Sequence, residues 1–259
     1  RDGNLSEIDF HNIDLSHVSL NSLCFSKKLH KANFKGTRLA ANTFLPQGHI
    51  EQVRSAIYSE DGRCILSAGD TTIKEWDVVT GQCLMTYVGH ENLVNSAIYS
   101  PDGHRILSAA NDNTIREWDR MTGQCLCVRQ DHKEYVTKAI YSPDGSKILS
   151  SSWDGTVLCY QRNSDGSWGT GKKVAQHKKN VKAIAISEDG IYCLTASGDN
   201  TVKEWRILDG KLTGQYCGHT DMVNSVMYSP DYSRILTGSY DGTVRIFDRF
   251  SYEEKFRFD

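Results

Sequence analysis

The sequence predicts an all-β protein built from copies of one unit of about forty residues. Three observations support this prediction. Five histidines, each near the start of one copy, are separated by 41, 42, 45 and 42 residues: His49, His90, His132, His177 and His219. Short runs of alternating apolar and polar residues fill each copy, which is typical of half-buried strands. Turn-forming pairs such as Asp-Gly separate these runs, and no stretch has the period of a long amphipathic helix.

The second copy, residues 89–130, shows the four strands that we expect in each unit. Its strand-like runs are Val94–Ser100, His104–Ala109, Thr114–Asp119 and Gln124–Arg129. The turns between them are Pro101-Asp102-Gly103, Asn111-Asp112-Asn113 and Met121-Thr122-Gly123. Gly, Asn and Asp tolerate the positive φ angles that tight hairpins require. Each copy is therefore expected to form a small antiparallel sheet of four strands.

Five copies cover the chain from residue 47 onward, with approximate bounds 47–88, 89–130, 131–176, 177–217 and 218–259. The second copy begins with Gly89-His90 and carries Trp118-Asp119 near the end of its third strand. A period of about forty residues with these two dipeptides is the signature of a β-propeller blade. Residues 47–259 resemble the WD-repeat (WD40) family, and the resemblance implies that each copy is one blade of a propeller.

The resemblance also implies a buried hydrogen-bond network in every blade. In the family it links the leading histidine, a Ser or Thr on the second strand, an Asp in the next turn, and the Trp of the WD pair. Besides the five histidines, the matching residues here are Ser67, Ser108, Ser150, Thr195 and Thr237; Asp70, Asp112, Asp154, Asp199 and Asp241; and Trp76, Trp118 and Trp205. A buried carboxylate is costly unless it accepts hydrogen bonds, which an imidazole N–H and a hydroxyl can supply. Tyr160 and Phe247 replace Trp in the third and fifth copies, so we expect an incomplete network at Phe247, which has no donor.

Five blades raise the question of ring closure, because WD-repeat propellers usually close with seven. Three arrangements stay open: an arc of a larger propeller, a closed ring of five blades, or a gap filled by residues 1–46 or by a partner chain. The sequence begins with Arg1 rather than Met. An open arc would expose sheet edges, which natural proteins avoid. We therefore expect this chain to be a piece of a longer protein.

Residues 1–46 follow a different rhythm and form a separate predicted segment. Apolar residues recur every five positions and, after a shift of one, continue: Leu5, Phe10, Leu15, Leu20 and Phe25, then Leu29, Phe34, Leu39 and Phe44. Neither the helical period nor the strand period accounts for this spacing. The segment resembles pentapeptide repeats, which implies a short right-handed β-solenoid with four pentapeptides per coil. The alternative is an irregular segment that provides a blade strand near residues 43–45.

Composition and charge exclude several classes of function. The chain has 30 Lys and Arg against 32 Asp and Glu, a net charge of −2, whereas general nucleic-acid binders are strongly basic. No run approaches the roughly 18 apolar residues of a membrane span, and no signal peptide begins the chain. Of the eight cysteines, Cys83 and Cys125 share one position in adjacent copies, and Cys64 and Cys193 both lie at second strands, as packing thiols in a reducing compartment do, so we expect a cytoplasmic location. No spacing of residues indicates a metal, a cofactor or a catalytic set, and residues 166–173 lack the hydroxyl of a phosphate-binding loop.

The expected binding surface is the wider face of the disc, around the central channel, where the family usually contacts partners. Carried over by position, it contains Arg54, Leu93, Asn111, Tyr135, Trp153, Lys182, Met222 and Tyr240, with Asn95 and Thr137 among the neighbouring slots. Aromatic residues and Arg are the usual energetic anchors of interfaces. The alternative is that Trp153 and Tyr240 only line the channel.

These observations together predict a non-catalytic scaffold or sensor that binds a protein or peptide. By analogy it would belong to a larger multidomain protein, such as a bacterial signalling or defence ATPase. We do not expect a membrane, nucleic-acid or small-molecule partner. Two alternatives are an enzyme with an active site at the channel, and nucleic-acid contact through the basic residues of 27–38 and 172–182.

Overall fold

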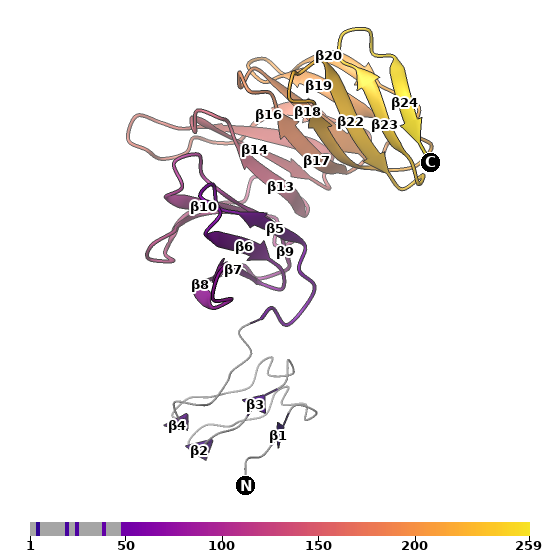
Figure 1. The fold of residues 1–259 in the computed structure, drawn as a ribbon. Coiled ribbons are helices and arrows are strands. Elements are labelled where there is room, and N and C mark those ends of the chain that lie inside the picture. Colours follow the sequence, from indigo (N-terminus) through magenta and orange to yellow (C-terminus); the bar gives the residue numbers. More distant parts are fainter. Residues whose placement is uncertain (1–3, 6–18, 21–23, 26–37, 40–47) are drawn as a thin grey trace.

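The computed structural model of the chain describes residues 4–5, 19–20, 24–25, 38–39 and 48–259 (Figure 1). Within these residues every regular element is a β-strand, which confirms the all-β prediction. The described residues from 48 onward form five four-stranded antiparallel sheets, which we number sheet 1 to sheet 5 in chain order. Each sheet corresponds to one copy of the repeat.

Every sheet is a meander in which four successive strands pair in chain order. Sheet 1 contains β5 (Ser55–Tyr58), β6 (Cys64–Ala68), β7 (Thr72–Asp77) and β8 (Cys83–Val88). Sheet 2 contains β9 (Val94–Tyr99), β10 (Arg105–Ala110), β11 (Ile115–Asp119) and β12 (Cys125–Arg129). Sheet 3 contains β13 (Val136–Tyr141), β14 (Lys147–Ser152), β15 (Thr156–Gln161) and β16 (Lys172–Gln176). Sheet 4 contains β17 (Val181–Ile186), β18 (Tyr192–Ser197), β19 (Val202–Arg206) and β20 (Lys211–Tyr216). Sheet 5 contains β21 (Val223–Tyr228), β22 (Arg234–Ser239), β23 (Val244–Asp248) and β24 (Glu254–Phe258).

The turn residues explain why the strands of sheet 2 could be predicted from the sequence. Gly103, Asn113 and Gly123 have φ angles of 70°, 66° and 70°. This left-handed region is open to Gly and tolerated by Asn, so these residues end one strand and begin the next. The four strands of sheet 2 match the predicted runs closely at both ends.

The five sheets follow one another along an arc (Figure 1). The first strands of neighbouring sheets are in contact: β5 with β9, β9 with β13, β13 with β17, and β17 with β21. Sheet 1, in indigo and purple, and sheet 5, in yellow, lie at opposite ends of this arc in Figure 1. Among the described residues the five sheets therefore form an open arc rather than a closed ring of five.

Four two-residue strands precede residue 40: β1 (Asn4–Leu5), β2 (Ser19–Leu20), β3 (Cys24–Phe25) and β4 (Arg38–Leu39). Strand β1 pairs with β3 and β2 pairs with β4, both in parallel. Leu5 stands opposite Phe25, and Leu20 stands opposite Leu39. Most of the predicted solenoid, residues 1–46, lies outside the described residues, so the solenoid and its boundary stay predictions.

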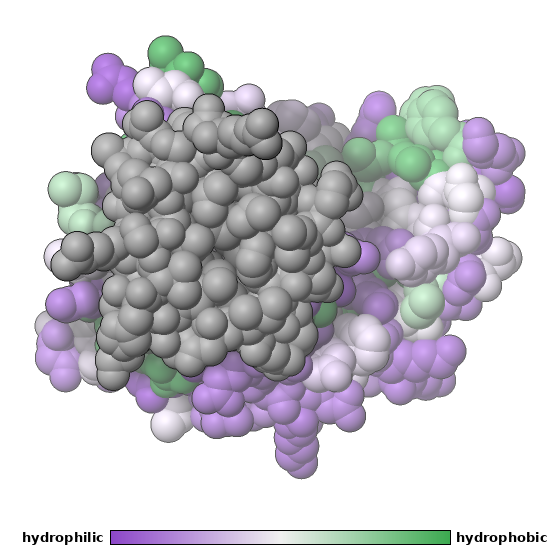
Figure 2. Space-filling model, turned by 90° about the horizontal axis from the view of Figure 1, so that it is seen from below, coloured by the Kyte–Doolittle hydropathy of each residue, from purple (hydrophilic) through white to green (hydrophobic). Residues whose placement is uncertain are grey.

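The core consists of thin apolar layers between neighbouring sheets. Between sheets 1 and 2 the layer contains Leu66, Ile73, Tyr87, Val94, Ile106 and Trp118, each at most 1% exposed. Burying a side chain of this size stabilises a protein by about 1.5–3 kcal/mol. Seen from below in Figure 2, the described surface is hydrophilic along its lower rim, and hydrophobic groups stand out at the top left as well as at the right. Each sheet thus depends on its neighbours for a core.

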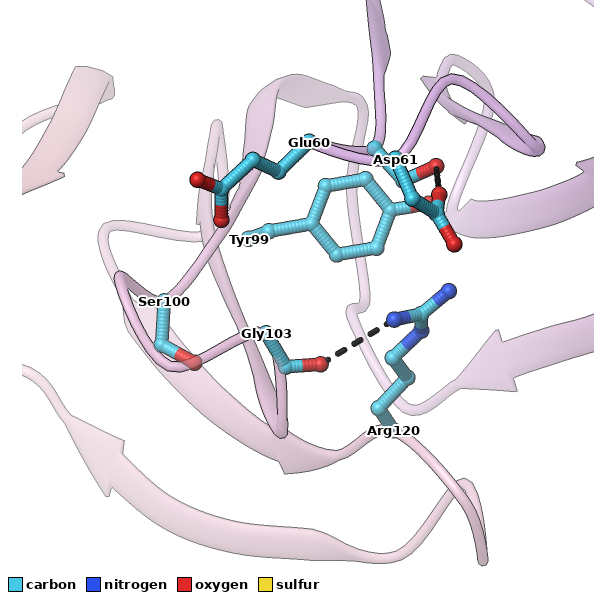
Figure 3. A pocket seen from close by; sticks show the side chains of 7 residues that line it. Glu60, Asp61, Tyr99, Ser100, Gly103 and Arg120 are labelled. Carbon is cyan, nitrogen blue, oxygen red and sulfur yellow. Dashed lines mark hydrogen bonds between the residues drawn. The ribbon is translucent and has the colours of Figure 1, made fainter.

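A buried glutamate ties sheet 1 to sheet 2. Glu75 on β7 is 4% exposed and accepts hydrogen bonds from Tyr99 Oη at 2.9 Å and Arg120 Nε at 2.8 Å. Figure 3 shows the ring of Tyr99 close to Arg120, whose guanidinium carbon lies 4.8 Å from the ring centre. Burial raises the pKa of Tyr99 and the neighbouring Glu75 raises it further, so the hydroxyl stays protonated and donates. We call this Glu–Tyr–Arg set the inter-sheet latch.

The latch recurs at two further junctions. Between sheets 2 and 3, Glu117 accepts hydrogen bonds from Tyr141 Oη at 2.8 Å and Arg162 Nη2 at 3.3 Å. Between sheets 4 and 5, Glu204 accepts them from Tyr228 Oη at 2.9 Å and from Nε of Arg249, the arginine that follows β23, at 2.8 Å. A carboxylate in such a dry position is tolerated because charged and neutral donors surround it.

The junction between sheets 3 and 4 replaces all three latch residues together. Cys159 stands where the other sheets have Glu, and Ile186 and Ile207 stand where they have Tyr and Arg. Cys159 is 9% and Ile207 is 3% exposed, and Ile186 packs against the same apolar cluster. Because all three of these residues are apolar, the junction leaves no charge unpaired at the latch positions.

Replacing Glu117 with Ala is expected to lower the free energy of unfolding by about 3 kcal/mol, because Arg162 and Tyr141 would lose a buried acceptor. Arg105 Nη1, which donates to Glu117 at 2.8 Å, would lose the same acceptor. Urea denaturation measures the change. The exposed Glu188→Ala variant is the control and should change the free energy by less than about 0.5 kcal/mol. Equal stability of the two variants would contradict the latch.

Candidate partner-binding site

The predicted histidine, hydroxyl and aspartate lie side by side in each of the five sheets. The distance from histidine Nε2 to the hydroxyl oxygen is 2.7 Å in all pairs: His49–Ser67, His90–Ser108, His132–Ser150, His177–Thr195 and His219–Thr237. The distance from Nδ1 to the carboxylate is 3.3 Å for His49–Asp70, 2.7 Å for His90–Asp112, 3.0 Å for His132–Asp154, 2.9 Å for His177–Asp199 and 2.8 Å for His219–Asp241.

The WD tryptophans extend this network in three sheets. The indole N–H donates to the same hydroxyl oxygen in the pairs Trp76–Ser67 at 2.7 Å, Trp118–Ser108 at 2.8 Å and Trp205–Thr195 at 2.9 Å. In sheets 3 and 5, Tyr160 and Phe247 are buried at this position, each 1% exposed. Phe247 has no donor, so in sheet 5 the network ends at Thr237.

The chemistry of the groups fixes the direction of the hydrogen bonds. An ionised aspartate only accepts, so histidine Nδ1–H donates to it and Nε2 accepts from the hydroxyl. Burial by itself would raise the pKa of Asp112, but hydrogen bonds from His90, Thr114 and the Glu91 backbone outweigh it and hold the pKa well below the ordinary value. Burial lowers the pKa of His90, and the contact with Asp112 offsets this only in part. In sheet 2 the network therefore contains a neutral histidine and an ionised aspartate.

A threonine that was not predicted from the sequence completes the network in every sheet. Its Oγ1 donates to the aspartate at 2.6 Å for Thr72, Thr114, Thr156 and Thr201, and at 2.7 Å for Thr243. The signal was available, because Asp-x-Thr occurs at this turn in all five copies. Buried and internally satisfied in five copies, these groups form a structural network rather than a reactive site.

Five of the eight predicted contact residues line one hollow on the arc. This hollow of about 450 Å³ is bounded by Arg54, Asn95, Asn111, Tyr135, Thr137, Trp153 and Lys182, which come from sheets 1 to 4. We call it the central hollow. Its volume lies in the range of sites that enclose small ligands or single side chains of a partner.

Two aromatic rings and a cation form one wall of the central hollow. The ring centres of Tyr135 and Trp153 lie 5.3 Å apart, and Lys182 Nζ lies 4.5 Å from the centre of the Trp153 ring. Tyr135 is 40% and Trp153 is 42% exposed. A cation over an indole face is attracted by the ring quadrupole. Burial lowers the pKa of Lys182.

Hydrogen bonds between sheets hold the floor of the central hollow. Asn95 Nδ2 on sheet 2 donates to Asn111 Oδ1 at 2.7 Å and to the carbonyl of Val136 on sheet 3 at 2.8 Å. Thr137 Oγ1 on sheet 3 donates to the carbonyl of Val181 on sheet 4 at 2.8 Å. Because these side chains cross two junctions, the lining of the hollow is positioned by the sheets themselves.

The charge of the central hollow is positive. Arg54 and Lys182 contribute two cations, and neither forms an ion pair with any described residue. The other lining residues carry amides, a hydroxyl and aromatic rings, and none is acidic. The hollow thus offers charged donors together with exposed aromatic surface.

Three predicted contact residues do not line the central hollow. Leu93 and Met222 are half-buried, and Tyr240 on sheet 5 is 62% exposed. The loop ahead of β21 and the turn after β22 carry Met222 and Tyr240, so these two lie toward the end of the arc beyond sheet 4. The repeat predicted these three residues as contact positions, but it did not predict which contact positions line the same hollow.

A second hollow of about 290 Å³ lies between the turns of sheets 1 and 2 (Figure 3). Arg120, the only basic residue among the described residues that line it, is already engaged, since it bonds Glu75 and donates to the Gly103 carbonyl at 3.1 Å. Glu60 and Asp61 add negative charge to the wall. This second hollow therefore belongs to the latch, and its described lining offers no free cation.

The described residues contain no group of three or more His, Cys, Asp or Glu side chains able to hold a metal ion. No helix among the residues that the structure describes is long and apolar enough to cross a bilayer.

Comparison with known proteins gives the same repeat. The profile of the family described as "WD domain, G-beta repeat" matches residues 41–77, 81–119, 123–161, 170–206 and 210–248. Among similar proteins, Protein groucho of Drosophila melanogaster is 39% identical over 66 residues, which cover 26% of this chain and 9% of that protein. Guanine nucleotide-binding protein subunit beta of Zea mays is 38% identical over 80 residues, covering 30% of this chain and 21% of that protein.

A longer match extends over most of the chain. Periodic tryptophan protein 2 of Arabidopsis thaliana is 25% identical over 260 residues, covering 93% of this chain and 28% of that protein. The matched region therefore spans less than a third of the length of each of these three relatives.

Lowering the pH from about 7 to about 5 is expected to reduce the free energy of unfolding. The folded pKa values of His90 and His177 are lowered, mainly by burial, so the unfolded chain, with histidine pKa near 6.5, binds these protons more readily. The lowered aspartate pKa values add a second loss of stability below about pH 3.9. Urea denaturation at a series of pH values measures both.

The matched variants for this pH test are His90→Gln and His104→Gln. The first should reduce the loss of stability between about pH 7 and pH 5, because one buried titrating group is removed. His104 is exposed, so its replacement should leave the slope unchanged. A stability that stays constant or rises as the pH is lowered would contradict the prediction.

Proposed function

This chain belongs to the WD-repeat family, and we propose that it is a non-catalytic scaffold that binds a protein or peptide through the central hollow. The observation that carries the proposal is that Arg54 and Lys182, which form no ion pair with the described residues, lie beside the exposed rings of Tyr135 and Trp153. Trp, Tyr and Arg are the residues most enriched among the energetic anchors of interfaces. The expected partner segment combines an acidic side chain with an apolar one.

The family relatives support a partner that is itself a protein. One relative is by name a subunit of a guanine nucleotide-binding protein, and a subunit contacts other chains. WD-repeat proteins are generally scaffolds of this kind. A role as the sensor end of a larger bacterial ATPase, and a cytoplasmic location, rest on the sequence alone and stay predictions.

The fixed lining of the central hollow favours binding over catalysis. Asn95 and Thr137 direct their polar groups into bonds between the sheets, whereas Arg54 and Lys182 form no ion pair within the described part of the chain and can meet a ligand. Neither is paired with a base, a nucleophile or an acid in the lining. Charged groups that attract an anionic side chain, next to aromatic surface, are what recognition of a peptide requires.

A random peptide library displayed on phage and selected on the 259-residue chain tests the proposal. Enriched peptides should carry Asp or Glu next to an apolar residue, and isothermal titration with a synthetic copy should give a measurable affinity. Trp153→Ala and Lys182→Ala should each weaken this affinity at least tenfold, since truncating a central anchor costs about 2 kcal/mol.

Tyr240→Ala is the matched control, because Tyr240 is an exposed aromatic residue in the equivalent turn of sheet 5 but does not line the hollow. Its affinity for the selected peptide should equal that of the wild-type chain. Failure to enrich any peptide, or equal binding by all variants, would reject the central hollow as the binding site.

A further inference from the structure

A third hollow, of about 360 Å³, lies beside the latch between sheets 1 and 2. We call it the Glu75 hollow, and its described lining is Cys64, Glu75, Leu84, Met85, Arg120 and Met121. Leu84 is 52% and Met121 is 81% exposed, whereas Glu75 is only 4% exposed. Exposed apolar groups thus surround a buried carboxylate, which suits a ligand that is apolar except for one hydrogen-bond donor.

At the junction between sheets 2 and 3, the chain fills the equivalent place with an aromatic ring of its own. Cys127, opposite the latch glutamate Glu117, corresponds to Met85 in sheet 1. Trp168, from the lengthened turn between β15 and β16, is 3% exposed and lines one small cavity together with Glu117 and Cys127. Its indole N–H donates to Glu117 Oε2 at 3.1 Å, and the guanidinium carbon of the sheet 3 latch arginine lies 4.7 Å from its ring centre. An indole from the following sheet therefore occupies the place that is hollow beside Glu75.

The junction between sheets 4 and 5 also contains a ring at this place. Gly214 stands opposite the latch glutamate Glu204, and a Cβ added to Gly214 would lie 2.7 Å from Cε1 of Tyr252. Tyr252, in the turn between β23 and β24, adopts a φ of 62°, which is uncommon for a residue other than Gly or Asn. In sheet 2 the same turn position is held by Gly123, which has no side chain. The Glu75 hollow thus belongs to the latched junction whose turn brings no ring.

The carboxylate of Glu75 lacks two donors that its counterpart in sheet 2 has. Glu117 Oε2 accepts hydrogen bonds from Arg105 Nη1 at 2.8 Å and from Trp168. Cys64 stands at the position of Arg105, and burial raises the pKa of its thiol, so it brings no cation to Glu75. One oxygen of Glu75 is therefore less well satisfied than the same oxygen of Glu117.

The hydrogen bond that Glu75 Oε2 does accept from the described residues is a shared one. Tyr87 Oη lies 3.2 Å from this oxygen and 3.0 Å from the carbonyl of Arg120. The phenol has a single proton to donate, so it cannot fully satisfy both acceptors. The other oxygen, Oε1, is engaged by the latch itself. Oε2 thus keeps the capacity to accept a further N–H donor.

We infer that the Glu75 hollow binds a tryptophan side chain of a partner protein, whose indole N–H donates to Glu75 Oε2. The contact repeats between two molecules what Trp168 does within this one. Leu84, Met85 and Met121 cover the rest of the ring, and methionine sulfur packs well against aromatic rings. Tryptophan is also strongly enriched among the anchors of interfaces. The lining of this hollow shares no residue with that of the central hollow, so the two are separate contact sites.

Saturation-transfer difference NMR on the 259-residue chain tests this inference, with N-acetyl-L-tryptophanamide as the probe. The expected dissociation constant is of roughly millimolar order, because the probe is a single small group. The analogue methylated at the indole nitrogen has no N–H donor and should bind about tenfold more weakly, since it leaves the carboxylate unsatisfied. N-acetyl-L-phenylalaninamide, which also lacks the donor, should show a similar loss.

A pair of leucine variants locates the bound probe. Leu84→Asp should weaken binding of the tryptophan amide about tenfold, because it replaces an exposed apolar wall with a charge. Leu126→Asp is the matched control. Leu126 holds the same position on β12 and is 47% exposed, but it does not line the Glu75 hollow. Its replacement should leave the affinity unchanged.

A second pair of variants fills the hollow from within the chain. Gly123→Tyr places a ring at the turn position that Tyr252 holds in sheet 5, and it should abolish binding of the tryptophan amide. Gly81→Tyr is the control, because Gly81 holds the same turn position in sheet 1 with a similar φ and has no atom within 4 Å of an added Cβ. Circular dichroism checks the fold of each variant, and Leu84→Asp decides the question if Gly123→Tyr does not fold.

Several results would overturn the inference. The tryptophan amide could fail to bind up to its solubility limit, or the methylated analogue could bind equally well, which would indicate a non-specific apolar contact. Unchanged binding by Leu84→Asp would place the probe elsewhere. Trp153→Ala, which removes a ring from the central hollow, should leave binding of the amide intact. If it abolished binding instead, the Glu75 hollow would be rejected while the proposed function would stand.

Discussion

The ionised aspartate inside each sheet is the interaction on which the rest of the structure depends. In sheet 3, Asp154 accepts hydrogen bonds from His132, from the Lys133 backbone and from Thr156, so it ties the loop before β13 to the turn after β14. The same loop and turn carry Tyr135 and Trp153, and Trp153 N donates to the Tyr135 carbonyl at 2.9 Å. A charge buried for structural reasons thus also positions the aromatic wall of the central hollow.

The sequence was most informative where a requirement repeats within one copy. Strands, turns and the histidine network depend on residues close together along the chain, and five copies of the same pattern reveal them. The inter-sheet latch could not be found in this way, because Glu75 and Arg120 belong to different copies. The repeat predicted the positions of the residues that line the central hollow. Tyr240 occupies such a position but lies outside the hollow, because which residues line it depends on how neighbouring sheets are placed. The latch glutamates do precede the WD tryptophan in three copies, but the sequence alone does not indicate their partners.

The latch makes the order of the sheets specific as well as stable. A sheet that carries Arg249 and Tyr228 fits behind Glu204, whereas behind Cys159 its guanidinium would be buried without an acceptor. Conversely, an apolar sheet placed behind Glu204 would leave a buried carboxylate unpaired. Both errors cost several kcal/mol, so the polarity of each face rejects a wrong neighbour. Junctions of similar shape are in this way distinguished by charge.

The charged groups that form hydrogen bonds within the fold differ from the charged groups that form no ion pair with described residues. The buried aspartates and the latch glutamates use their hydrogen-bonding capacity within the fold, and binding a partner through them would cost stability. Arg54 and Lys182 form no ion pair with described residues, so a partner's carboxylate can bond to them without breaking any contact of the fold. Under the proposed function, substitutions at these positions are expected to change recognition while leaving the networks intact. A repeated scaffold can therefore hold an unrepeated site, because the residues that keep the sheets together differ from Arg54 and Lys182, the charged residues proposed to meet a ligand.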